Sequence, residues 1–432
     1  MKKSLIMVLG FCAALALSIL TITTLTPQAS AQPSGPAVSV LIDGLPVSFD
    51  VKPVIRNGRI LVPFRAIAEA LNVKVAWDGS TRTVLATDAE TSIRLQIGRY
   101  TAFRNEAVLS LDVPPQLVGG RTMIPLRFFS EAFGCQVVWD DRLYGARIAS
   151  SPKPMTVIGF YALGDRKTSS WTNLFGKEFP DTASGNTDLI SELALGWYSL
   201  DEQGNLLTRS RTGWQRPEGW EKVLEAAATY RVGSEMVVHL TDEGSVIAKL
   251  LSDDAAMARA IADIAREAGG YQGVNINFEG LGWQDDGNRL IEVRNQFNNF
   301  IQLLSAQLKG ANLTLTLTLH APNSAYKGYD YRVLGTLADR IVVMAYDYGP
   351  TPEPVEKVLQ AVEMAKADVP AGKLILGILA PSETAESIVT KVGIAKRYNL
   401  SGIAVWRLGL LPTDMWDALR STVRVRAAQA PQ

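Results

Sequence analysis

The chain has 432 residues, of which 47% are hydrophobic, and its 43 basic side chains balance its 43 acidic ones. This length allows two or three domains with hydrophobic cores of their own. Without a basic excess, the composition gives no indication of binding to nucleic acid or to anionic lipid. With two histidines in the whole chain, a histidine-rich metal site is nearly excluded, and no metal or other cofactor is expected.

The first 31 residues have the order of a secretory signal peptide. Two lysines precede an apolar run from Leu5 to about Leu20, and Ala29-Ser30-Ala31 provides a small-x-small cleavage site. An uncleaved membrane anchor is the alternative, because the run is near spanning length. We expect an exported protein with no membrane span after cleavage.

Cys135 is the only cysteine that remains after such cleavage, so no internal disulfide is expected. It lies in the alternating, strand-like run FGCQVVWD. We therefore expect a buried apolar residue rather than a nucleophile.

Two segments, Gly58 to Asp78 and Gly120 to Asp140, match without a gap as GRILVPFRAIAEALNVKVAWD and GRTMIPLRFFSEAFGCQVVWD. A fixed offset indicates an internal duplication. The pattern of each copy predicts a short strand, then a helix, then a strand that ends in Trp-Asp. We therefore expect residues 37–149 to form one small α+β domain. The matched pairs include Arg65 and Arg127, Glu69 and Glu131, and Trp77 and Trp139.

The duplicated segment resembles the stalk-like domain named after the N-terminal region of copper amine oxidases. The resemblance rests on the VPxR…E…W pattern in both copies, and no copper ligands come with it. We expect each Arg and Glu to form an ion pair within the domain, with an anionic glycan as the alternative partner. The two tryptophans are expected in the core of the domain rather than as sugar platforms.

A polar linker at residues 150–154, SSPKP, precedes a different pattern in which apolar runs alternate with helical segments. Eight such runs match a (β/α)₈ TIM barrel, which we expect over residues 155–424. The alternative is an open doubly wound sheet. Such a fold typically has a glycine-rich phosphate loop after the first strand, and the segment GFYALGDRK lacks that pattern. The apolar runs are residues 155–162, 189–200, 234–241, 273–279, 312–321, 340–349, 373–380 and 402–409.

Chemistry in such a barrel lies at the C-terminal ends of the strands. In the fourth strand, GVNINFE, the residues Asn275, Asn277 and Glu279 alternate with apolar ones and so share a face. Aromatic rings stack on apolar sugar faces and carboxyl groups transfer protons, so the groups at the strand ends suit a pyranose site. These are Phe160 and Tyr161 from strand one, Trp197 and Tyr198 from strand two, Met344, Tyr346 and Asp347 from strand six, Trp406 from strand eight, and Trp283 in the loop after strand four.

These motifs resemble those of glycoside hydrolase family 18, the chitinase and endo-N-acetylglucosaminidase family. The family motif D-G-x-D-x-D-x-E corresponds to QGVNINFE at residues 272–279, and M-x-Y-D is intact at residues 344–347. Within the family, the chain looks most like the bacterial spore and cell-wall group. There Asn275 is normal, whereas Gln272 and Asn277 are departures.

The resemblance implies substrate-assisted, retaining catalysis, in which the 2-acetamido oxygen of the substrate attacks its anomeric carbon. Glu279 would be the general acid and base, and residue 277 would orient the acetamido group. Tyr346 would hydrogen-bond the acetamido carbonyl, and Asp347 would support the site.

Asn277 can accept an N–H hydrogen bond but carries no charge. Loss of one well-aimed electrostatic group costs about 3 kcal/mol, or on the order of a hundredfold in rate. Without that anion, Glu279 is also expected to ionise more easily, with burial against Phe278 or Trp283 acting in the opposite direction. Another endo-N-acetylglucosaminidase family, number 85, uses an asparagine in the orienting role, so Asn277 is compatible with catalysis.

We therefore expect an exported hydrolase of a β-linked N-acetylglucosamine polymer, with peptidoglycan ahead of chitin, in a spore or cell-wall setting. Two alternatives stay open: a lectin-like barrel that binds glycan without turnover, and a structural protein of a spore coat or envelope. The sequence leaves the oligomeric state open. Substrate binding is assigned to Asn275, Trp406, Met344, Tyr161, Trp197 and Trp283.

Overall fold

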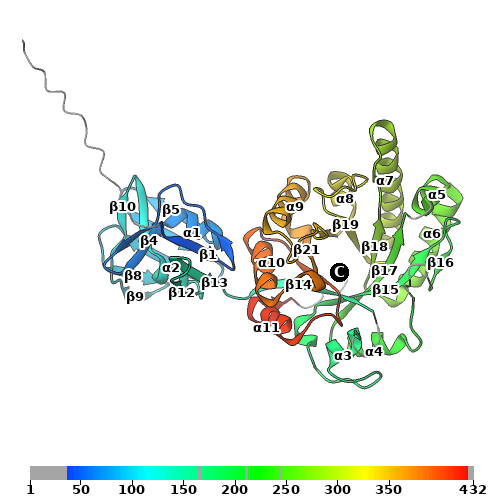
Figure 1. Cartoon of the computed structure of the whole chain (residues 1–432), viewed down its shortest axis with the longest axis horizontal. Helices are drawn as coiled ribbons and strands as arrows, with labels where there is room; N and C mark the ends of the chain where they lie inside the picture. Colours follow the sequence, from blue (N-terminus) through cyan, green and yellow to red (C-terminus); the bar gives the residue numbers. More distant parts are fainter. Residues whose placement is uncertain (1–36, 163–167, 210–212, 214, 243–244, 427–432) are drawn as a thin grey trace, which may run out of the picture. The chain divides into compact units, whose positions relative to one another are not determined.

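The structure, a computed structural model, describes residues 37–162, 168–209, 213, 215–242 and 245–426. They form a small domain of short strands and two helices, followed by a (β/α)₈ barrel, which confirms the predicted fold class (Figure 1). The predicted signal peptide lies outside the described residues. Among the helices of the described ranges, none is both long and apolar enough to cross a membrane.

The barrel is a closed sheet of eight parallel strands. Each strand pairs with the next one along the chain, and β14 pairs with both β15 and β22, which closes the ring. The eight apolar runs thus each contribute one strand. The strands are β14 (Lys153–Tyr161), β15 (Glu192–Leu200), β17 (Gly233–Thr241), β18 (Gly273–Glu279), β19 (Thr314–His320), β20 (Arg340–Met344), β21 (Leu374–Leu379) and β22 (Gly402–Trp406).

Two short strands extend the sheet. The strand β16 (Leu206–Leu207) runs antiparallel to β15, and β23 (Val423–Val425) runs parallel to the start of β14. Because Lys153 pairs with Val423, the last two residues of the predicted linker belong to a strand.

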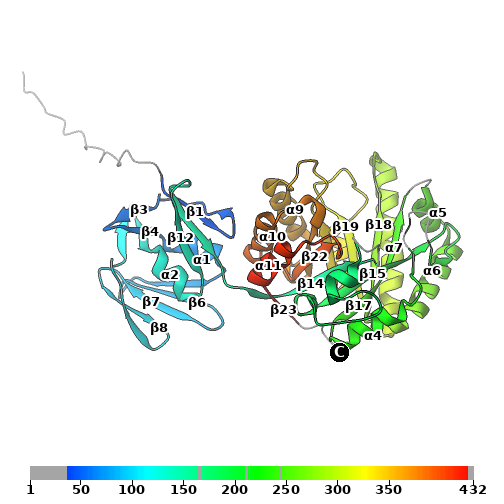
Figure 2. The same cartoon turned by 60° about the horizontal axis from the view of Figure 1, so that its bottom comes forward.

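Helices cover the outside of the barrel (Figure 2). In α6 (Asp254–Glu267), the Asp253 side chain caps the first turn by accepting the N–H groups of Ala255 and Ala256. The buried residues of α6 recur at helical spacing, as expected for a surface helix with one apolar stripe. The other helices are α3 (Ser170–Phe175), α4 (Glu221–Thr229), α5 (Val246–Ser252), α7 (Gly287–Gly310), α8 (Tyr331–Leu337), α9 (Val355–Asp368), α10 (Ala385–Arg397) and α11 (Thr413–Thr422).

The interior of the barrel holds a buried ionic network. Arg340 donates to both oxygens of Glu192 at 2.7 Å and to Glu235 at 2.5 Å. Burial raises the pKa of Glu235, while Arg340 acts against that rise. Glu235 also accepts from the amide of Asn275 at 3.2 Å, so the network reaches the strand that carries the predicted site.

Thr318 completes this network by donating its hydroxyl group to Asn275 Oδ1 at 2.8 Å, and it is 1% exposed. Replacing Thr318 with Val is expected to lower the free energy of unfolding by about 2 kcal/mol, because a buried amide oxygen loses its donor. Urea unfolding measures this loss. The control is Thr314→Val, at a partly exposed hydroxyl group, and an equal effect of both variants would contradict the account.

The small domain is built as two copies that face each other. Each element from β3 to β6 recurs 62 residues later, from β10 to β13, which confirms the duplication. The strands β4 (Arg59–Pro63) and β11 (Arg121–Pro125) pair antiparallel with Val62 opposite Ile124, so equivalent residues meet at a local two-fold axis. The remaining elements of the two copies are β3 (Val54–Arg56), α1 (Phe64–Ala70), β5 (Lys74–Asp78), β6 (Thr83–Thr87), β10 (Gln116–Val118), α2 (Leu126–Ala132), β12 (Gln136–Asp140) and β13 (Gly145–Ala149).

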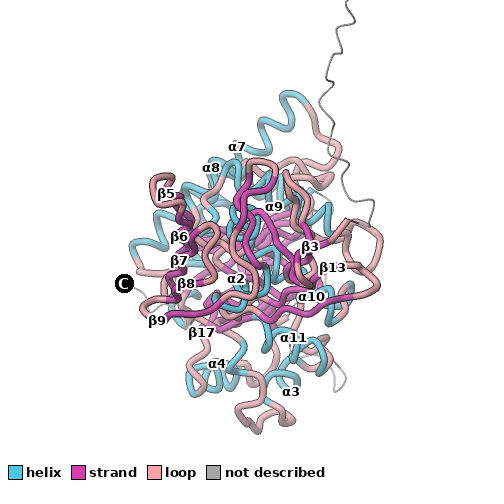
Figure 3. Tube along the Cα trace, turned by 90° about the vertical axis from the view of Figure 1, so that its left-hand side faces the viewer, coloured by secondary structure: helices cyan, strands magenta, loops and turns pink. Residues whose placement is uncertain are grey.

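Two further sheets flank this central pair. One has the order β5-β6-β7-β8-β9, and its strands lie side by side in Figure 3; the other has the order β12-β13-β1-β2. In each sheet, the strand that ends in Trp-Asp, β5 or β12, lies at an edge. The strands not yet named are β1 (Ser39–Ile42), β2 (Leu45–Pro46), β7 (Ser92–Gln96), β8 (Thr101–Arg104) and β9 (Ala107–Ser110).

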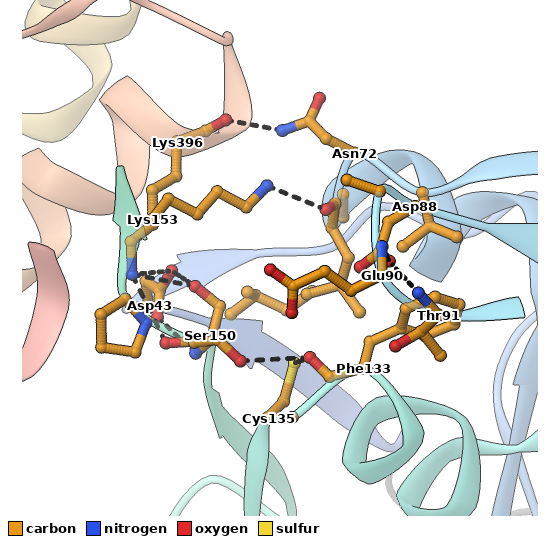
Figure 4. Close-up of a pocket in the computed structure, with 18 of the residues that line it drawn as sticks. Asp43, Asn72, Asp88, Glu90, Thr91, Phe133, Cys135, Ser150, Lys153 and Lys396 are labelled. Carbon is orange, nitrogen blue, oxygen red and sulfur yellow. Dashed lines mark hydrogen bonds and ion pairs between the residues drawn. The ribbon is translucent and has the colours of Figure 1, made fainter. Parts of the chain in front are cut away.

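Cys135 lies just before β12 and is 6% exposed, as predicted for a buried apolar residue (Figure 4). Burial raises the pKa of its thiol to about 11. The thiol is therefore protonated at neutral pH and a poor nucleophile. Nearby, Asp43 accepts hydrogen bonds from the N–H group of Ser150 at 2.8 Å and from its hydroxyl group at 2.5 Å.

Candidate active site

The strand β18 places one carboxyl group where a ligand can reach it. Asn277 is 2% exposed, and its Nδ2 atom donates to Glu279 Oε1 at 2.9 Å. Glu279, the last residue of β18, keeps 29% of its side chain exposed. Phe278 points the other way and stacks on Phe300 of α7 with ring centroids 5.4 Å apart, so it does not help to keep Glu279 protonated.

A histidine from the neighbouring strand faces Glu279. The register of β17 against β18 pairs His239 with Asn277, and His239 Nε2 lies 3.5 Å from Glu279 Oε1. Burial raises the pKa of Glu279, but His239, then His320 and the Asn277 amide, outweigh burial and hold that pKa below its usual value. This is the direction expected from the missing aspartate.

Replacing His239 with Phe removes this neighbour, so the pKa of Glu279 is expected to rise. An acid catalyst is lost as pH rises through its pKa, so the alkaline limb of kcat/KM moves to higher pH. The pH–rate profile on a soluble substrate measures the move, and His320→Phe, which removes a weaker effect, should move the limb less. An alkaline limb that does not move in His239→Phe contradicts the assignment.

The other titratable groups that act electrostatically with Glu279 are Tyr329, Tyr346 and Asp347.

The turn after β20 brings a tyrosine and a second carboxyl group toward Glu279. Glu353, which is 3% exposed, accepts the N–H groups of Asp347 at 3.0 Å and Tyr348 at 3.1 Å and so holds this turn. Burial, then the negative charges of Glu279 and Asp347, keep the pKa of Tyr346 well above its usual value. Tyr346 is therefore a neutral donor, and no described residue accepts its hydroxyl group.

Partial shielding from water by the surrounding turn, then the charges of Glu353 and Glu279, raise the pKa of Asp347. Its side chain is exposed, and its backbone has a φ of 64°. Asp347 therefore lies beside the acid as a second, more weakly acidic carboxyl group.

An apolar wall lines the interior next to these polar groups. Trp406 ends β22 and meets Phe160 edge to face, with ring centroids 5.4 Å apart. Met344 ends β20, is 5% exposed and lies opposite His320 in the register of β19 and β20. Trp406 is partly exposed, so it can offer part of its ring to a sugar.

Three residues assigned to substrate binding lie elsewhere. Asn275 is 0% exposed and is engaged by Glu235 and Thr318 below the site. Tyr161 and Trp197 are 2% and 1% exposed and contact each other in the outer core, at 6.2 Å between centroids. The prediction that these three bind substrate is wrong, because their side chains present no surface to a ligand.

Trp283 is the most open of the predicted aromatics, at 60% exposure. It meets Tyr326 edge to face at 5.9 Å, and Tyr326 stacks on His320 at 3.9 Å. Gly328 donates its N–H group to the Leu281 carbonyl at 3.0 Å, which ties the loops after β18 and β19 together. These rings form an aromatic row that ends beside Glu279.

Three residues of the site were not predicted from the sequence: His239, Glu353 and Tyr326. His239 could have been found, because it stands near the end of an apolar run where barrel chemistry lies. No sequence pattern predicts that the Glu353 side chain contacts the turn after β20. Within the described ranges, no group of three or more His, Cys, Asp or Glu side chains is placed to hold a metal ion.

Comparisons with known families agree with this geometry. Residues 241–385 match the model of glycosyl hydrolases family 18, and residues 41–145 match the copper amine oxidase N-terminal domain. The two resemblances drawn from the sequence are therefore confirmed. The glycosidase match thus lies within the barrel and includes β18 and β20.

A sequence relative is a putative sporulation-specific glycosylase, YdhD, of Bacillus subtilis (strain 168), 24% identical over 44% of this chain and 45% of that protein. The chain thus spans less than half of this relative. Among solved structures, the spore cortex-lytic enzyme SleL of Bacillus megaterium QM B1551 is similar with a TM-score of 0.53 and 16% identity, over 74% of this chain and 81% of that one. A chitinase of Chromobacterium violaceum ATCC 12472 has a TM-score of 0.51 and 19% identity, over 62% of this chain and 98% of that one. These structural likenesses support the fold alone.

Proposed function

We propose that this chain, which carries a family 18 glycosyl hydrolase barrel, is an exported enzyme that cleaves β-linked N-acetylglucosamine polymers, with peptidoglycan as its substrate. Glu279 acts as the general acid and base of a substrate-assisted, retaining reaction. The predicted signal sequence and the named spore enzymes among the similar proteins support an envelope or spore setting.

One observation carries the proposal. Among the described residues, no donor reaches Asn277 Oδ1, although this atom is buried. A buried acceptor without a donor is costly, and because this oxygen has no open surface, a ligand N–H group reaches it only after neighbouring side chains shift; the ligand would then supply the missing donor. Because the Asn277 amide group donates to Glu279, the free oxygen lies next to the acid, where the acetamido N–H of a bound sugar would lie.

The reaction then divides among three side chains. Glu279 gives its proton to the leaving glycosidic oxygen while the acetamido oxygen of the substrate attacks the anomeric carbon. Asn277 Oδ1 accepts the acetamido N–H, and the Tyr346 hydroxyl donates to the acetamido oxygen. Water then opens the oxazolinium ion, and the Glu279 carboxylate takes the proton of that water molecule.

Glu279 Oε1 is occupied by the Asn277 amide and faces His239, so Oε2 is the oxygen that carries the proton. Asp347 adds a negative charge beside the oxazolinium ion and partly replaces the charge that Asn277 lacks. This assigns Asp347 a role in stabilising the intermediate.

A lectin-like barrel without turnover is the second candidate, and the lowered pKa of Glu279 favours it. A glutamate that is ionised at neutral pH binds sugar hydroxyls but does not protonate a leaving group. Activity that appears only at acidic pH, below the usual pKa range of a glutamate, where Glu279 regains its proton, separates the two functions.

The experiment compares residues 32–432 on peptidoglycan and chitooligosaccharides with the same chains after de-N-acetylation. Cleavage of acetylated chains alone is expected, because only they carry the attacking oxygen. Equal cleavage of both would contradict substrate assistance, and binding without cleavage at every pH would establish the lectin.

A further inference from the structure

Two surface grooves of the small domain occupy equivalent positions in the duplication. The first has a volume of about 520 Å³ and the second a volume of about 420 Å³. Each charged or tryptophan residue that lines the first groove has its counterpart, 62 positions away, in the second. The pairs are Asp50 and Asp112, Arg65 and Arg127, Glu69 and Glu131, Trp77 and Trp139, and Arg121 and Arg59.

The two copies complete each other's grooves. Arg121 of the second copy pairs with Asp50 of the first at 2.5 Å, and Arg59 of the first copy pairs with Asp112 of the second at 2.7 Å. These exchanged ion pairs account for two of the five matched positions, because they join the copies beside the β4–β11 pairing.

The remaining three positions do not join the two copies, although Trp139 Nε1 donates to Asp141 at 2.7 Å and its ring meets Tyr144 edge to face. Trp77 is 42% exposed and Trp139 is half-buried, so the prediction that both lie in the core is wrong. Arg127 comes only within 4.0 Å of Glu131, and Arg65 has no ion pair among the described residues. The predicted Arg–Glu pairs are therefore weak or not formed, and the side chains are available to a ligand.

The chemistry of the grooves suits a neutral sugar chain. An open indole stacks on the apolar face of a pyranose ring, and guanidinium and carboxylate groups bond hydroxyl and acetamido groups at its edge. Each groove holds two arginines and two acidic residues, so its formal charge is balanced and gives no preference for a polyanion.

We propose that these two grooves are glycan-binding sites, each taking one segment of an N-acetylhexosamine chain and together retaining the enzyme on an insoluble polymer. Naming this glycan rests on the proposed function of the barrel, whereas the existence of the sites does not. Two sites on one domain strengthen attachment through effective concentration, without a further contact.

The test measures depletion of the full chain from suspensions of peptidoglycan and of chitin. A Glu279→Gln background prevents digestion during the assay. Trp77→Ala and Trp139→Ala are each expected to weaken binding roughly five- to tenfold, and the double variant more than either. The matched control is Tyr100→Ala, at an aromatic residue that is 57% exposed and lines neither groove.

A second pair of variants, Arg65→Gln and Arg127→Gln, changes exposed helix residues, so both variants are expected to fold as the wild type does. If these two arginine variants bind the polymer more weakly, the result supports the two binding sites. Their turnover of a soluble substrate, measured in the protein that keeps Glu279, should be unchanged. Tryptophan variants that bind as the Tyr100→Ala control does would overturn the proposal. If wild type binds polymer through the grooves but cleaves nothing, the sites stand and the proposed function of the barrel fails.

Discussion

Glu279→Gln is expected to lower kcat by about a thousandfold or more while glycan binding stays within a few-fold of wild type. The amide keeps the shape of the carboxyl group and can still bond Asn277, but it has no proton to give to the leaving oxygen. Initial rates on a soluble chitooligosaccharide measure kcat, and calorimetry on the same ligand measures binding.

Glu292→Gln is the matched control, because Glu292 is an exposed residue of α7 that pairs with Arg289 at 3.0 Å. This control should retain full activity. If Glu279→Gln keeps a tenth or more of the wild-type rate, Glu279 is not the acid, and another carboxyl group, with Asp347 as the candidate, takes that role.

Asn277→Asp is expected to raise kcat by about a hundredfold, because a carboxylate at this position stabilises the positive oxazolinium ion. The 2.9 Å contact with Glu279 would then join two carboxyl groups that share a proton. A nearby anion raises the pKa of Glu279, so the alkaline limb of the pH–rate profile also moves to higher pH.

Profiles of kcat and kcat/KM for wild type and Asn277→Asp measure both effects. Asn295→Asp, an exposed asparagine-to-aspartate change on α7, controls for added negative charge. A slower Asn277→Asp enzyme would contradict the account. It would mean that the amide is itself the working group and that its donation to Glu279 matters more than a charge.

The barrel was predictable because parallel strands buried on both faces are apolar throughout, and eight such runs appear in order. The ends of the strands were less predictable. The run at 340–349 ends as a strand at Met344, because Asp347 turns the backbone and Glu353, six residues later, holds that turn. A contact between a turn and a later buried carboxylate leaves no periodic signal.

At the site, the sequence mainly failed to predict which aromatic side chains point into the barrel and which point outward. In β14, Phe160 and Tyr161 are both aromatic, so the sequence does not tell which one points inward; the structure places Phe160 inside. In β15, an irregularity between Gly196 and Tyr198 breaks the alternation, and Trp197 joins the outer core. The position of His239 beside Glu279 follows from the register of β17 and β18, which the sequence alone does not give.

The small domain illustrates a related limit. The duplication and the two Trp-Asp strand ends are plain in the sequence, and an apolar aromatic in a strand predicts a core position. Both strands prove to lie at sheet edges, which opens their tryptophans to the surface. The position of a strand within its sheet depends on pairings that a single sequence does not specify.

The decisive measurement follows the first product of wild-type hydrolysis by proton NMR, on an N-acetylated oligosaccharide at acidic pH below the usual pKa range of a glutamate. We expect release of the β-anomer before it equilibrates, and no release by Glu279→Gln. Initial release of the α-anomer, or saturable binding with no product at any pH, would contradict it.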